Sequence, residues 1–204
     1  MNHQRWNNWE QMQKIQADVT KGRSITVNGL ADTQRHHLAY SLVRSAGKKA
    51  LYVAANDLQA RKAYRNLQSL IGEGVYYFPF REKMLYDVEA KSHERAFERI
   101  EALDRLLSGN YTVLVLSCES LLDFFMPADE FCMHRLSISV GDTLQMEQAI
   151  LRLVEMGYER EEQVEGRGQF AVRGGILDVF PVQLEKPVRI ELFDIEVDSI
   201  RVFD

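Results

Sequence analysis

The stretch FAVRGGILDVFPVQLEKPVRIELFD, residues 170–194, alternates short apolar runs with glycine and proline turns. Runs rich in Val, Ile and Phe and bounded by such turns predict β-strands. Arg173 and Arg189 interrupt two of these runs, each directly after a valine. The residues alone leave two interpretations. Either the arginines are ordinary outward-facing strand residues with Phe193 in the core, which is the simpler reading, or the three side chains form a binding surface.

Around this stretch, residues 132–204 predict a small α+β domain. A strand is expected near 134–140, followed by a helix that begins near Asp142 or Thr143 and ends at Gly157. Four short strands follow, in GRGQFAV (166–172), ILDVFP (176–181), VRIELF (188–193) and DSIRVF (198–203). The chain stops at Asp204 directly after a strand-like run, so we expect a fragment of a longer protein.

Residues 1–131 instead alternate strands with helices. Strands are expected at 24–30, 49–55, 75–79 and 111–117, with a strong helix over 92–109. Repeated strand–helix–strand units predict an α/β fold, a parallel sheet with helices on both faces. The domain boundary is expected at about residue 131.

Composition narrows the function classes. The net charge is −5 and the isoelectric point is about 5.6, which argues against nucleic acid as the main partner, although a local basic patch stays possible. Cys118 and Cys132 fit no metal spacing, and adjacent His36 and His37 point about 100° apart on a helix, a poor metal pair. No run of about 18 apolar residues or signal core occurs, so we expect a cytoplasmic protein without membrane contact. No catalytic residue, cofactor or metal site is expected.

The segment SITVNGLADTQRHH, 24–37, lies where an α/β nucleotide-binding domain carries its phosphate loop. Gly29 and Thr33 suit such a loop, but Asp32 occupies the position of the phosphate-binding lysine. A carboxylate repels a triphosphate and suits a helix N-terminus, so Asp32 is expected to be a helix cap. We predict a degenerate loop without nucleotide binding.

The motif that starts at Gly168 resembles a signature shared by two bacterial excision-repair families, UvrB and the transcription-repair coupling factors. It reads glycine, x, aromatic, two residues, Arg-Gly, then Asp-x-Phe-Pro, and later a proline and an arginine before a strand that ends in Phe-Asp. The helix over 92–109 and the strand TVLVLS, 112–117, extend the likeness more loosely upstream. Asp32 favours the N-terminal region of the coupling factors, because UvrB-type chains keep an intact phosphate loop.

The resemblance implies a degenerate RecA-like sheet that later chain segments complete, and an α+β domain that docks UvrA. It places the UvrA contacts on Arg173, Arg189 and Phe193, with Arg189 and Phe193 on one face of a strand. It also implies a full-length ATP-dependent DNA translocase whose other partners are RNA polymerase, DNA and a masking C-terminal domain of the same chain. The rival hypothesis is a nucleotide-binding or DNA-binding domain of a UvrB-type repair helicase.

Overall fold

The computed structural model describes residues 10–81, 89–123 and 125–204. It divides into two compact units, Met1–Asp123 and Phe124–Asp204. Each unit has its own sheet and its own hydrophobic core. The predicted fold class, a parallel α/β sheet plus a smaller α+β part, is confirmed.

The first unit contains a three-stranded parallel sheet in the order β1-β3-β2. Its elements in chain order are α2 (Glu10–Thr20), α3 (Asp32–Ala46), β1 (Ala50–Ala54), α4 (Asp57–Ile71), β2 (Val75–Phe78), α5 (Glu89–Ser108), β3 (Val113–Ser117) and α6 (Cys118–Leu121). Three of the four predicted strands and the predicted helix over 92–109 are therefore present, although α5 begins three residues before Ser92.

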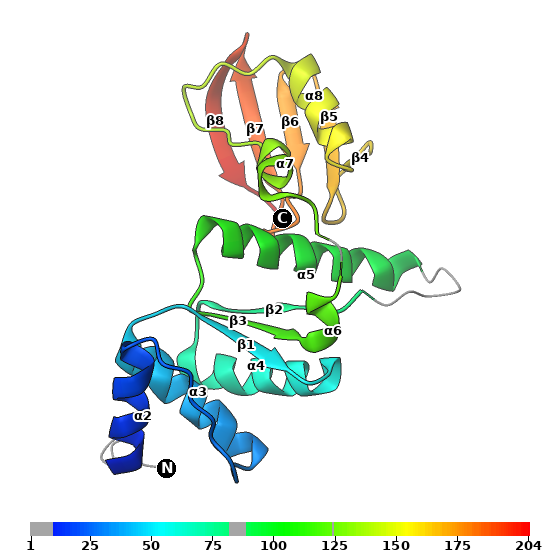
Figure 1. The fold of residues 1–204 in the computed structure, drawn as a ribbon. Coiled ribbons are helices and arrows are strands. Elements are labelled where there is room, and N and C mark those ends of the chain that lie inside the picture. Colours follow the sequence, from blue (N-terminus) through cyan, green and yellow to red (C-terminus); the bar gives the residue numbers. More distant parts are fainter. Residues whose placement is uncertain (1–9, 82–88, 124) are drawn as a thin grey trace. The chain divides into compact units, whose positions relative to one another are not determined.

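Helices cover both faces of this sheet, as Figure 1 shows for α4 and α5. Every residue of the central strand β3 is buried. Val113 and Val115 pack in one cluster with residues of α3 and α4, whereas Leu114 and Leu116 pack in another with Ala102 of α5. Because strand residues alternate between faces, a strand covered on both sides needs this continuous apolar sequence.

Two predicted strands are absent. Residues 24–30 form no strand, and Ile25 and Val27 are more than a third exposed. Residues 134–140 also form no strand, although Leu136 and Ile138 pack against the core of the second unit. Alternating apolar residues supply strand propensity, but a strand also needs a neighbour that accepts its backbone hydrogen bonds.

The second unit contains a five-stranded mixed sheet in the order β4-β5-β6-β7-β8. Its elements are α7 (Ala128–Met133), α8 (Met146–Glu155), β4 (Glu159–Arg160), β5 (Gln169–Arg173), β6 (Ile176–Val179), β7 (Val188–Phe193) and β8 (Glu196–Val202). Strands β5 to β8 are antiparallel neighbours, and β4 pairs with β5 in parallel (Figure 1). Ala149 and Leu153 of α8 pack on Phe170 and Leu177, so the helix covers one face of the sheet.

The Arg-Gly-Gly sequence makes a two-residue turn that fixes the register of β5 and β6. Arg173 pairs with Ile176, which leaves Gly174 and Gly175 as the turn. Gly174 has a φ of 60°, in the left-handed region that favours glycine. A Cβ atom on Gly175 would lie 3.0 Å from the backbone oxygen of Leu192, so β7 approaches the turn closely.

The described residues contain neither a candidate membrane-spanning helix nor a cluster of metal-ligating side chains. None of the helices in 10–81, 89–123 and 125–204 is long and apolar enough to cross a membrane. Across the same residues, no three His, Cys, Asp or Glu side chains gather where they could hold a metal ion.

Candidate functional site

The face of the five-stranded sheet opposite α8, which we call the outer face, carries the three residues predicted to contact UvrA. Val188, Ile190 and Leu192 pack toward the helix-side core, so the alternate residues of β7 lie on the outer face. Cross-strand pairing extends this face over β5, β6 and β8. Its members are Ala171, Arg173, Ile176, Asp178, Arg189, Glu191, Phe193, Glu196, Ser199 and Arg201.

Arg189 is held in place by two neighbours. Its Nε lies 2.6 Å from Oδ1 of Asp178, and its Nη2 lies 2.7 Å from Oδ2 of the same carboxylate. The two residues are direct cross-strand partners in β6 and β7. The guanidinium carbon also lies 5.0 Å from the centre of the Phe203 ring. The hydrogen bonds and charge of Asp178 raise the pKa of Arg189, so its charge is permanent.

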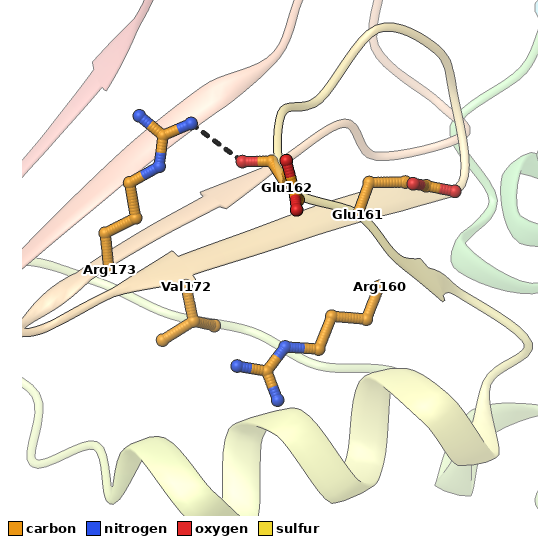
Figure 2. Close-up of a pocket in the computed structure, with 5 residues that line it drawn as sticks. All are labelled: Arg160, Glu161, Glu162, Val172 and Arg173. Carbon is orange, nitrogen blue, oxygen red and sulfur yellow. Dashed lines mark hydrogen bonds between the residues drawn. The ribbon is translucent and has the colours of Figure 1, made fainter.

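Arg173 lies on β5, with β6 between it and the strand of Arg189. Its Nη2 donates to the backbone oxygen of Glu162 at 2.7 Å, a neutral acceptor (Figure 2). Within the described residues, no carboxylate pairs with Arg173. Its positive charge is therefore available to a partner.

A hollow of about 590 Å³ lies beside Arg173. It is lined by Arg160, Glu161, Glu162, Val172 and Arg173. In Figure 2, Arg173 and Val172 point to opposite sides of β5, and Arg160 lies on the side of Val172. The mixed charges give this hollow no single preference for an anion or a cation, so it adds no second ligand site.

Phe193 lies at the end of β7 and is 80% exposed. It pairs with Glu196 across a turn in which Asp194 has a φ of 58°. Aspartate tolerates this left-handed conformation better than most residues do. Ile195 in the same turn is 47% exposed, so the hairpin ends in an apolar tip. The alternative that Phe193 belongs to the core is wrong.

The structure thus places Arg173, Arg189 and Phe193 on one face, from β5 and β7. Two functional candidates escaped the sequence analysis, Asp178 and Phe203. Asp178 lies in the Asp-x-Phe-Pro motif, which could have flagged it. Phe203 gave no signal beyond its place in a predicted strand.

The N-terminal turn of α3 holds the remaining predicted residues. Asp32 is not the helix cap: Ala31 is, and the Ala31 amide donates to Oε1 of Gln34. Asp32 Oδ2 instead lies 3.1 Å from Nζ of Lys62 on α4, and this bond with Lys62 lowers the pKa of Asp32. Gly29 and Thr33 are both exposed, and Gly29 has a φ of 79°.

The carboxyl edge of the parallel sheet, where α/β folds bind ligands, is occupied by side chains. Asp57 Oδ1 accepts the hydroxyl of Tyr77 and Oδ2 lies 2.8 Å from Nε of Arg61. Burial works against ionisation of Asp57, but these hydrogen bonds prevail and its pKa is lowered. The amide of Asp57 also donates to Glu119. Both carboxylate oxygens of Asp57 therefore already accept hydrogen bonds from side chains of this chain, and Asp57 is poorly placed to hold magnesium.

Comparison with known proteins shows what the second unit is similar to. A family model described as UvrB interaction domain matches residues 136–204, which include α8 and all five strands of the second unit. Residues 136–204 are thus similar to the UvrB interaction domain family. This confirms the resemblance of the motif that starts at Gly168.

The similarity extends beyond that domain. The chain is 34% identical over 177 residues to a transcription-repair-coupling factor of Bacillus subtilis strain 168, with 86% of this chain and 15% of the relative covered. A transcription-repair-coupling factor of Staphylococcus aureus strain USA300 is 32% identical over 179 residues, with 87% and 15% covered. The chain is thus homologous to part of the coupling factors and spans about 15% of the length of these relatives.

Proposed function

We propose that this chain is the N-terminal module of a transcription-repair coupling factor and recruits UvrA through the outer face of its UvrB interaction domain. Arg173, Arg189 and Phe193 are the proposed contacts. The observation that carries the proposal is the combination of an 80% exposed Phe193 with a braced arginine on the same strand, within the matched domain. Arginine and aromatic side chains are enriched among the residues that dominate binding energy.

The three side chains would contribute differently. Phe193 offers apolar area at the hairpin tip, so burying it on a partner removes that area from water. Arg173 offers a charge that no carboxylate of the described chain neutralises. Arg189 offers the guanidinium edge that Asp178 does not occupy. A complementary UvrA surface would present an apolar pocket with carboxylates near both arginines.

In the full-length protein, the proposed context is an ATP-dependent DNA translocase that acts in the cytoplasm at stalled RNA polymerase. DNA and a C-terminal domain of the same chain are further proposed partners there. For this chain we propose no catalysis and no nucleotide binding, because Asp32 pairs with Lys62 at the position where a phosphate loop needs a free lysine.

The test is the affinity of the 204-residue chain for purified UvrA, measured by isothermal titration. Arg173→Ala and Phe193→Ala are expected to weaken binding about 30-fold or more, as hot-spot residues do. Both side chains are exposed, so stability should change by less than about 0.5 kcal/mol. Parental affinity in both variants would show that the outer face does not dock UvrA.

Arg160→Ala is the matched control for Arg173→Ala. It removes the same charge from the same hollow, but its side chain lies on the other side of β5 (Figure 2). We expect it to keep the parental affinity within about twofold. Equal losses in both variants would indicate a general charge effect in place of a specific contact.

Arg189 needs a gentler substitution, because Arg189→Ala leaves the buried Asp178 carboxylate without its counter-charge and lowers the melting temperature. Arg189→Lys keeps a positive charge but cannot form the planar fork. We expect it to fold and to lose part of the UvrA affinity. The melting temperature, measured on each variant, separates lost contacts from lost structure.

A further inference from the structure

The Asp-x-Phe-Pro motif contributes an aspartate, Asp178, to the outer face, beside the proposed UvrA contacts but not among them. Asp178 lies in the middle of β6, and its side chain is 8% exposed. It lies on the opposite side of β6 from the core residues Leu177 and Val179. A buried carboxylate is unfavourable unless it is paired and hydrogen-bonded. Its position therefore requires a specific partner, which is Arg189.

Building on the proposed function, we infer that Asp178 and Phe203 are positioning residues that hold the Arg189 guanidinium in the orientation UvrA binds. The two hydrogen bonds, at 2.6 and 2.7 Å, engage Nε and Nη2 and fix the plane of the guanidinium. The Phe203 ring, 5.0 Å from the guanidinium carbon, limits motion out of that plane. Together they order a long side chain before any partner arrives.

This arrangement also decides which edge of Arg189 a partner meets. Nε and Nη2 of Arg189 donate to Asp178, while Nη1 has no hydrogen-bond partner among the described residues. A UvrA carboxylate can therefore approach only along Nη1 and the second hydrogen of Nη2. Arg173 differs, because its brace is a loop carbonyl and leaves its charge unmatched.

A second ion pair on the outer face is more exposed than the pair of Asp178 and Arg189. Arg201 bonds Glu191, whose other oxygen accepts from Ser199 at 3.0 Å. The carboxylate of Glu191 is 30% exposed against 8% for Asp178, and Arg201 is 58% exposed against 30% for Arg189. Asp178 and Arg189 form the more buried pair, as a preordered contact requires.

The decisive variant is Asp178→Asn, which keeps the shape of the side chain and removes the charge. If Asp178 positions Arg189, binding must order the freed side chain, and UvrA affinity of the 204-residue chain falls about 2- to 12-fold. Phe203→Leu removes the stacked ring but keeps apolar volume, and it should also weaken binding. An unchanged or higher affinity in both variants overturns the inference, since Asp178 would then only compete with UvrA for Arg189.

Two comparisons separate positioning from other effects. Asp198→Asn removes one charge from the same sheet at an exposed site and should leave affinity unchanged. In an Arg189→Lys background, Asp178→Asn should add less than it does in the parent, because both changes act through one guanidinium. Full additivity contradicts the inference. If Asp178→Asn unfolds the chain, Phe203→Leu carries the test alone.

Arg189→Lys, measured in parallel, distinguishes this inference from the proposed function. If it keeps the parental affinity, UvrA does not recognise the guanidinium of Arg189, and both the proposed contact and its positioning are wrong, while Arg173→Ala and Phe193→Ala still test the rest of the site. If it loses affinity while Asp178→Asn and Phe203→Leu do not, the docking site stands and the positioning role is wrong.

Discussion

His36 shows how far the role of a single residue depends on its neighbours. It lies next to His37 at the start of a polar-looking helix, yet it is only 4% exposed. Nδ2 of Asn66 donates to its Nδ1 at 2.8 Å, and its ring lies 5.8 Å from that of Tyr52. Burial lowers the pKa of His36 below its ordinary value, against the opposing charge of Asp32. The residue is a neutral, hydrogen-bonded member of the core.

A pH dependence follows from this burial. Between the lowered folded pKa of His36 and the unfolded value near 6.5, only the unfolded chain binds the proton. The stabilisation is therefore complete above about pH 6.5 and is lost as the pH falls, at up to about 1.4 kcal/mol per pH unit. We expect the parental melting temperature to drop more between pH 7.5 and 5.5 than that of His36→Gln.

His37→Gln is the matched control for that experiment. It removes an adjacent imidazole that is less buried, so a change in pH dependence that is found only in His36→Gln is attributable to the buried ring. Identical slopes for the parent and His36→Gln would mean that His36 binds its proton as readily in the folded chain as in the unfolded one, contrary to its lowered pKa.

At the scale of elements, the sequence predicted a strand correctly where the pattern of buried apolar residues is enough to specify it. The apolar run Val113–Ser117 became a central strand because both of its faces are covered. Alternation along β7 correctly put Arg189 and Phe193 on one face. The run 24–30 has the same alternation but no strand beside it, and pairing is a property of the whole fold.

The same limit explains why the partner of Arg189 was missed. The Gly174–Gly175 turn makes the pairing of β5 with β6 readable from sequence. The pairing of Asp178 with Arg189 instead depends on the longer connection between β6 and β7, whose length does not fix a register. Cross-strand partners on a polar face therefore emerge only from the structure.

The N-terminal turn of α3 leads to a prediction about nucleotide binding. We expect no heat of Mg-ATP binding to the 204-residue chain at millimolar nucleotide. Asp32 occupies the position of the phosphate-binding lysine, and its carboxylate pairs with Lys62. Asp32→Ala, which removes the repelling carboxylate, should also fail to bind. Micromolar binding by the parent that disappears when Gly29 or Thr33 is changed would contradict the proposal of a degenerate loop.

At the scale of the whole molecule, the proposed docking residues and the residues that brace them fall in one unit. Arg173, Asp178, Arg189, Phe193 and Phe203 all lie within Phe124–Asp204. The core of that unit is formed by α8 and by the sheet it covers. We therefore propose that the second unit is an independent UvrA-docking domain, with its start near residue 124 or, as the sequence pattern suggested, near 132.

Expression of residues 124–204 alone tests this proposal. With a helix packed on five strands, the piece has more than the three strands that independent stability requires. We expect cooperative thermal unfolding with a heat-capacity change of about 1 kcal/mol/K, as for other domains of this size. Its UvrA affinity should match that of the 204-residue chain within about twofold.

The shorter piece 132–204 and a core variant sharpen the same experiment. Nη2 of Arg152 on α8 donates to the backbone oxygens of Met133 and Arg135, at 3.1 and 3.2 Å, and both acceptors remain in the shorter piece. It should therefore fold as well, with α7 contributing little. Leu153→Asp puts a carboxylate at a position that is 3% exposed and should abolish folding and binding together. If 124–204 shows no cooperative transition while the whole chain does, the second unit depends on the first for its stability, and the proposed docking domain is not autonomous.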